Sequence, residues 1–161
     1  MERYGWSEGQ VGYSLGFVGL MIAIVQGGVI RPVVSKFGPE KALYVGLFFN
    51  AIGLTLIGLA YEGWMLYAIM IPYSLGGLAG PSIQSIMTSQ VPDNEQGELQ
   101  GGLTSLVSVT SIIGPVMMTS IFAYYTSPEN SVYLPGAPFL LGGLFALTAS
   151  VLAWRTLKGL S

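Results

Sequence analysis

Five stretches of the chain carry no charged side chain, and each of them is at least 20 residues long. They cover residues 9–30, 42–61, 63–92, 99–128 and 130–154. A helix of about 20 mostly apolar residues crosses the hydrocarbon core of a bilayer while satisfying its own backbone polar groups. We therefore predict an all-α membrane protein with five transmembrane helices, at residues 10–33, 40–61, 63–90, 99–125 and 136–157.

The composition supports a membrane protein and excludes several kinds of chemistry. Only 9% of the 161 residues are charged and 52% are hydrophobic, whereas about 25% are charged in a typical soluble domain. Cysteine and histidine are absent, which removes the commonest metal ligands and the commonest general base. The net charge of −2 offers no basic footprint for nucleic acid. We expect no enzyme, no cofactor, no metal and no nucleic-acid partner.

The positions of the basic residues predict how the chain is oriented. Alternate connections lie on the same side of a membrane, and one side receives five basic residues: Arg31, Lys36, Lys41, Arg155 and Lys158. The other side receives Arg3 alone. The positive-inside rule then places the N-terminus outside and the C-terminus in the cytoplasm, in the cell (inner) membrane. Because five is an odd count and the opening residues look like a loop, we expect a fragment of a longer protein.

Helix-breaking residues gather in the middle of the third predicted helix: Pro72, Gly76, Gly77, Gly80 and Pro81. Proline frees a carbonyl and bends a helix, and lipid tolerates such a break only where other groups or a cavity satisfy the backbone. Interrupted transmembrane helices point to transport sites. A moving hinge and a static kink fit this pattern equally well. Gly114 and Pro115 predict a similar break in the fourth helix.

Small residues also recur at four-residue spacing, which lets helix backbones approach closely. The sets are Gly12 with Gly16, Gly76 with Gly80, and Gly142 with Ala146 and Ser150. They favour a compact bundle over five independent anchors.

Few side chains inside the predicted helices are strongly polar. Gln26, Asn50 and Gln84 each carry an amide that needs a partner in hydrocarbon, either a bound ligand or a group on another helix. Tyr73 is a weaker candidate for ligand binding, because membrane tyrosines are often interface anchors. Three hydroxyls share one face of the fourth helix, where they either line a wet pathway or bond back to their own helix: Thr104, Ser108 and Ser111.

Several short motifs carry a resemblance to a known family. The most specific are Ser89-Gln90-Val91, Gln96-Gly97-Glu98-Leu99-Gln100-Gly101 and Thr110-Ser111-Ile112-Ile113-Gly114-Pro115, and others lie at residues 3–7, 31–32, 36–43, 63–65 and 76–84. In order and spacing they resemble the C-terminal half of major facilitator superfamily transporters, with the tetracycline/proton antiporter branch nearest.

The resemblance implies that the chain carries helices eight to twelve of a twelve-helix transporter. Substrate would bind between the two halves, against the first, third and fourth helices of this chain, which carry Gln26, Gln84 and the face with Thr104. The implied partners are the lipid bilayer, a small-molecule substrate and the missing N-terminal half. The implied function is export of a drug-like molecule by alternating access, and the alternative is a non-transporting membrane scaffold or accessory subunit.

Two positions depart from the branch that the chain resembles. Asn50 stands where that branch usually carries an acidic residue, and an amide cannot exchange a proton at physiological pH. Proton coupling would therefore fall to the missing half. Glu95 stands in place of the arginine usual before Gln96-Gly97.

Overall fold

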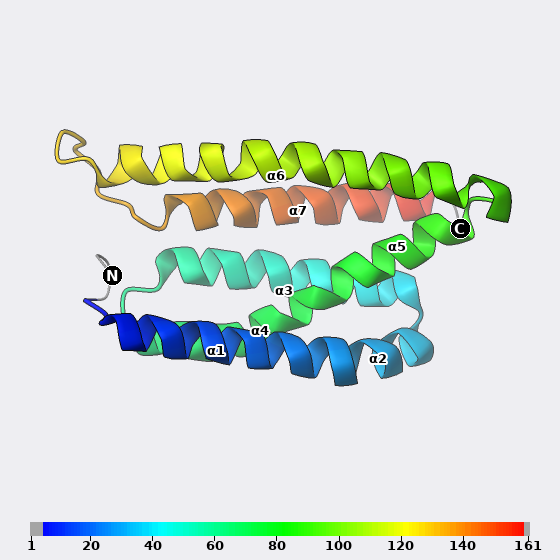
Figure 1. Cartoon of the computed structure of the whole chain (residues 1–161), viewed down its shortest axis with the longest axis horizontal. Coiled ribbons are helices and arrows are strands. Elements are labelled where there is room, and N and C mark those ends of the chain that lie inside the picture. The colour runs from blue at the N-terminus through cyan, green and yellow to red at the C-terminus, as the bar shows by residue number, and fades with distance from the viewer. Residues whose placement is uncertain (1–4, 160–161) are drawn as a thin grey trace.

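The computed structural model describes residues 5–159, so Arg3 and Tyr4 of the first motif lie outside the described residues. The all-α prediction is confirmed, because residues 5–159 form five helical segments long and apolar enough to cross a membrane (Figure 1). These five spans are Glu8–Phe37, Pro39–Leu59, Gly63–Ser89, Asp93–Thr126 and Ala137–Lys158.

The first span is one long helix whose geometry changes part-way. It begins with α1 (Glu8–Ile24), passes through the π-helical segment η1 (Val25–Val29) and continues as α2 (Ile30–Phe37). Ser7 caps the start, because its side chain accepts a hydrogen bond from the backbone N–H of Gln10. The last residue of the span, Phe37, lies four residues beyond the boundary predicted at 33.

The second span, α3 (Pro39–Leu59), follows a sharp turn. Gly38 takes a φ of 83°, a left-handed conformation that glycine adopts without steric cost, and Pro39 then opens the helix. The remaining spans contain α4 (Gly63–Ser74), η2 (Leu75–Leu78, a 3₁₀ turn), α5 (Ala79–Ser89), η3 (Asp93–Glu95, also 3₁₀), α6 (Gln96–Thr126) and α7 (Ala137–Lys158).

Helix α3 lies in the middle of the molecule and packs against α7 on one side and the α4–η2–α5 span on the other (Figure 1). Towards α5, a Cβ added at Gly46 would lie 2.5 Å from the backbone nitrogen of Ala79. Towards α7, a Cβ added at Gly143 would lie 2.6 Å from the Oγ1 of Thr55. Glycines therefore let both neighbours come close to α3, which is how membrane helices gain van der Waals contact.

The predicted small-residue sets correspond only in part to these contacts. Gly76 packs closely on Asn50, whereas Gly12, Gly16 and Gly80 have no atom within 4 Å of an added Cβ. Where α1 meets α4, the contact is aromatic, with the Phe17 ring 5.3 Å from that of Tyr67.

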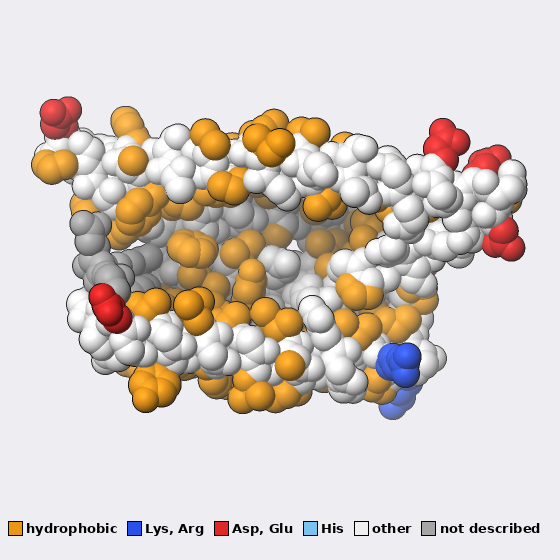
Figure 2. Space-filling model, viewed as in Figure 1, with side chains coloured by type: hydrophobic (Ala, Val, Ile, Leu, Met, Phe, Trp, Pro, Cys, Tyr) orange, Lys and Arg blue, Asp and Glu red, His pale blue; other side chains and the backbone are white. Residues whose placement is uncertain are grey.

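The outer surface suits a lipid environment. Neither α1 nor α6 has a buried residue, and large apolar side chains stay exposed along both helices. Figure 2 shows charged side chains only towards the two ends of the long axis, with hydrophobic side chains between them and a hollow between α6 and α1. In Figure 1, α2 and the last turn of α7 lie at the same end of the molecule.

Candidate ligand-binding site

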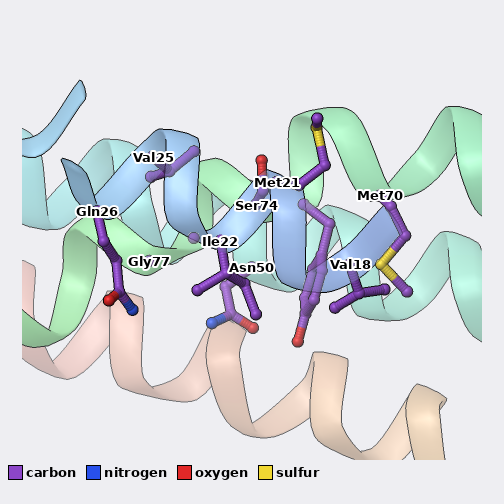
Figure 3. A pocket seen from close by; sticks show the side chains of 11 residues that line it. Val18, Met21, Ile22, Val25, Gln26, Asn50, Met70, Ser74 and Gly77 are labelled. Carbon is purple, nitrogen blue, oxygen red and sulfur yellow. The ribbon is translucent and has the colours of Figure 1, made fainter. Parts of the chain in front are cut away.

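A cavity of about 250 Å³ lies where the first, second and third spans meet. It is mostly apolar, and its lining includes two amides, a phenol and a hydroxyl (Figure 3). The lining residues are Val18, Met21, Ile22, Val25, Gln26, Asn50, Met70, Tyr73, Ser74, Gly76 and Gly77. Three of the side chains predicted from the sequence, Gln26, Asn50 and Tyr73, are thus brought to one place.

The π-helical segment η1 supplies Gln26 to this cavity. Its wider turn is closed by the backbone N–H of Ile30, which donates to the carbonyl of Val25 five residues earlier. Val25 anchors the segment, since it is only 4% exposed and lies against Gly77 of η2. The next residue, Gln26, is left exposed on the cavity side.

The 3₁₀ turn η2 forms the opposite wall, and the prolines in the helices on either side of it explain why the third span is interrupted. Pro72 cannot donate to the carbonyl of Ala68, so the end of α4 loses one helical hydrogen bond. Pro81 lies in the first turn of α5, where a missing N–H costs little. The predicted break at Pro72, Gly76 and the following residues is therefore present as a change from α to 3₁₀ geometry.

Asn50 reaches the cavity from α3 because Gly76 leaves room for it. A Cβ added at Gly76 would lie 3.2 Å from the Cβ of Asn50 and 3.3 Å from its Nδ2. The side chain of Asn50 is half-buried there. Tyr73 is half-buried beside it and packs on Gly53, where an added Cβ would lie 2.5 Å from its ring.

The two amides point the same way. Figure 3 shows the ends of Gln26 and Asn50 directed to one side of the helices and the hydroxyl of Ser74 directed to the other. Ser74 donates to the carbonyl of Ile71 at 2.7 Å. Within residues 5–159 neither amide has a hydrogen-bond partner, so both keep a donor and an acceptor for a ligand.

The structure does not bring Gln84 to this cavity. Its Nε2 donates to the Oε1 of Gln100 at 3.2 Å, which links α5 to α6. Gln84 also lines a separate polar pocket of about 510 Å³ with Asp93 and Gln96. Its amide thus takes the interhelical role that the sequence left open.

The hydroxyl face of α6 also lies outside the cavity. Thr104, Ser108 and Ser111 are all exposed, and Ser108 donates to the carbonyl of Thr104 at 2.8 Å. Of the two interpretations offered for this face, back-bonding to the helix therefore holds for Ser108.

The break predicted at Gly114 and Pro115 is not seen, because α6 is a continuous α-helix from Gln96 to Thr126. Pro115 removes only the one hydrogen bond to the carbonyl of Ser111, and helices in membranes tolerate such a loss. The third span differs because two prolines flank a pair of glycines.

Sequence reasoning missed the π segment and the apolar lining. A glutamine followed by two glycines within an apolar helix was an available signal, since π-bulges are often found at functional sites. The methionines Met21 and Met70 carried no comparable signal, because a methionine in an apolar run is usually a packing residue.

Comparison with known protein families shows to which family the chain belongs. The family model described as Major Facilitator Superfamily matches residues 1–159. The chain belongs to the Major Facilitator Superfamily. No solved structure matches the chain significantly.

Among similar curated proteins, a class C tetracycline resistance protein of Escherichia coli is 38% identical over 91% of the chain and 37% of its own length. A class G tetracycline resistance protein of Vibrio anguillarum is 34% identical over 84% of the chain and 35% of its own length. A class B protein of Escherichia coli is 32% identical over 75% of the chain and 30% of its own length. The chain thus spans about a third of the length of the curated relatives it matches.

Proposed function

We propose that the chain forms the C-terminal transmembrane half of a secondary active transporter that exports a drug-like small molecule. The observation that carries this proposal is the cavity at which two interrupted spans meet and expose two unpaired amides. Interrupted helices are the usual place for transport sites within a membrane. The relatives named tetracycline resistance proteins support tetracycline-type efflux as the activity.

The mechanism follows from what the chain's own residues can do. Apolar residues such as Val18 and Ile22 pack against the body of a substrate, while Gln26 and Asn50 bond to its polar edge. The π segment η1 and the 3₁₀ turn η2 pack against each other, so both walls of the cavity can change shape together. Access would alternate as this bundle rocks against the N-terminal half, which is the missing partner.

Coupling to protons falls outside this chain in our proposal. No Asp, Glu, Lys, Arg or His lies among the lining residues, and Asn50 cannot titrate. A proton relay through a membrane needs ionisable side chains. We infer that the coupling residues belong to the N-terminal half.

We further propose the inner membrane as the location, with the N-terminus outside. Arg31, Lys36 and Lys41 lie in α2 and the start of α3, at the end of the molecule that also holds the last turn of α7. Five basic residues at that end favour the cytoplasmic side. Gln84, Thr104, Ser108 and Ser111 stay predictions as substrate contacts elsewhere along the path.

An accumulation assay tests the proposed function. Cells that lack their own efflux pumps would express the full-length transporter, and the uptake of tetracycline and of a panel of amphipathic drugs would be followed with time. We expect lower accumulation of at least one compound than in cells with an empty vector. Absence of efflux for every compound would contradict the proposal and leave the membrane-scaffold alternative.

Gln26→Leu provides the first residue-level prediction. Loss of one hydrogen bond to substrate should raise the KM of export about three- to tenfold and leave membrane insertion unchanged. The matched control is Gln90→Leu, which removes an exposed amide at the end of α5, outside the cavity. Unchanged export by the Gln26 variant would reduce that residue to a packing role.

A further inference from the structure

We propose that the hydrogen bond between Gln84 and Gln100 is a reversible latch, which closes the angle between α5 and α6 and opens when α6 swings away from the rest of the bundle. The latch rests on the proposed function, since it identifies which wall of this chain moves during alternating access. Three sets of contacts carry the proposal: those of α5, those of α6 and those of the two amides.

Helix α5 is the stationary partner of the latch. At its start, Ala79 packs so closely on α3 that a Cβ added at Gly46 would lie 2.5 Å from the Ala79 nitrogen. Further along, Ile86 is buried in a cluster with Leu43 of α3 and Leu157 of α7. Close packing on two other spans leaves α5 little freedom to move.

Helix α6 is held much more loosely. None of its residues is buried, and it packs on α7 and on the turn η3 that precedes it. Its first turns carry Gly97, Gly101 and Gly102, and none of these has an atom within 4 Å of an added Cβ. Glycine lowers the stability of a helix, and segments with few buried contacts open most easily. The start of α6 can therefore pivot while α5 stays in place.

The two amides tie α5 to α6 where the helices converge. The Nε2 of Gln84 donates to the Oε1 of Gln100 at 3.2 Å, over a separation of 16 residues. Hydroxyls on the neighbouring turns do not reach across. Thr88 donates to the carbonyl of Gln84 at 2.7 Å, and Ser105 donates to a carbonyl of its own helix at 2.9 Å. Figure 1 shows α5 running obliquely from the level of α3 to the start of α6, so this bond sets the angle between the two helices.

The bond can also break, because water competes for both amides. Gln84 is exposed and Gln100 is half-buried. Gln84 borders the polar pocket of about 510 Å³, with Ser85 and Asp93 beside it. Water that enters this pocket offers each amide another partner, so the bond contributes only a modest net stabilisation. Its loss should shift the ratio of closed to open protein about two- to tenfold.

A distance between two spin labels tests the latch in the full-length protein, held in phospholipid nanodiscs. The labels are attached at Ile83→Cys on α5 and Leu106→Cys on α6, which are both exposed. This chain has no cysteine of its own, and any cysteine elsewhere in the protein is first replaced by serine. Double electron–electron resonance should show that Gln100→Leu shifts weight from a shorter to a longer distance, about two- to tenfold. Gln100→Glu is the matched control, because it keeps an oxygen that accepts from Gln84, and it should resemble the wild type.

A covalent tie tests whether the latch has to open during export. Gln84→Cys and Gln100→Cys are combined and joined by a short bis-methanethiosulfonate reagent in inverted membrane vesicles. We expect the cross-link to stop drug uptake by the energised vesicles, and dithiothreitol to restore it. The matched control is a cross-link within one helix, between Leu147→Cys and Val151→Cys, which are exposed on α7. Uptake should survive that cross-link.

Two results would overturn the latch: unchanged distances in Gln100→Leu, or undiminished uptake while positions 84 and 100 are cross-linked. A Gln84→Leu variant that raised the KM of export without moving the distances would also overturn it, and would show a substrate contact instead. Failure of the proposed function looks different. In that case the distances would shift as expected, while the wild-type protein transported no compound.

Discussion

At the scale of single residues, the glycines of this bundle fall into two groups that the sequence alone does not separate. Gly46, Gly53 and Gly143 occupy places where an added Cβ would lie 2.6 Å or less from a neighbouring helix. Gly12, Gly16 and Gly80 face open space. The first group sets the distances between α3 and its neighbours, and it should resist substitution where the second group does not.

Gly46→Ala should destabilise the bundle. Its new Cβ would meet the backbone nitrogen of Ala79 at 2.5 Å, and a backbone atom cannot move aside without separating α3 from α5. We expect the free energy of unfolding in detergent to fall by about 1–3 kcal/mol, measured by titration with a denaturing detergent.

The matched control for that substitution is Gly80→Ala, one residue after Ala79 on α5. It has no atom within 4 Å of the added Cβ, so its stability should stay equal or rise by up to about 1 kcal/mol through helix propensity. Equal losses in both variants would contradict the assignment of Gly46 to the α3–α5 contact.

At the scale of elements, the segment η1 is the least expected part of the first span. A π turn contains one residue more than the α turn that it replaces, and here the extra length lies beside Gln26. Gly27 and Gly28 have no atoms within 4 Å of an added Cβ, so no packing contact holds the bulge open from their side.

Deleting Gly28 should convert η1 to regular α-helix. Because the bulge absorbs the missing residue, α1 and α2 keep their positions. The free energy of unfolding should therefore change by less than about 1 kcal/mol. The direction of Gln26 changes, so export should lose substrate affinity. Deletion of Gly19 is the control, because Gly19 lies in regular α-helix and no bulge can absorb the lost residue. The residues before position 19 would rotate about the helix axis, and Phe17 would lose its contact with Tyr67. If both deletions lowered the free energy of unfolding equally, the contradiction would show that the bulge does not absorb the loss of Gly28.

The elements also show which features the sequence could predict. The number of helices follows from Glu8, Arg31 and the other charges, because each charge excludes its own position from hydrocarbon whatever the rest of the chain does. The 3₁₀ turn could be anticipated because Pro72 acts on its own helix. The π segment, the continuity of α6 through Pro115 and the separation of Gln84 from Gln26 depend on packing between spans, which the order of residues does not express.

Part of the candidate site could also be predicted from the sequence, because it depends on local properties of the chain. Gln26, Asn50 and Tyr73 were recognisable as polar groups in apolar runs, and that property is local. Their meeting in one cavity depends on Gly76, which admits Asn50, and on Val25, which fixes η1 against Gly77. Those contacts join residues about 25 to 50 positions apart.

At the scale of the whole molecule, the first and fifth spans run in the same direction, so the described chain begins and ends at opposite ends of the long axis (Figure 1). On the face that Figure 2 shows, the charged side chains of the described residues lie towards those ends. In the orientation that we propose, the end with α2 faces the cytoplasm, because the basic residues gather there.

Labelling of single cysteines tests that orientation, and the chain suits the experiment because it contains no cysteine of its own. Asn94 and Ser131 are both exposed and lie in connections on opposite sides. A membrane-impermeant maleimide should label Ser131→Cys in intact cells and Asn94→Cys only after lysis. The reverse pattern would show that the basic end lies outside.

The pairing of α3 with α7 has a consequence for how the protein is made. The third span covers one flank of α3, but the flank that packs on α7 stays uncovered until the fifth span has been made. Helix α6 has no buried residue and packs on α7, so it too lacks this partner until α7 has been made. A nascent chain stopped before residue 137 would thus present a bare glycine-containing flank to the cell's quality-control machinery.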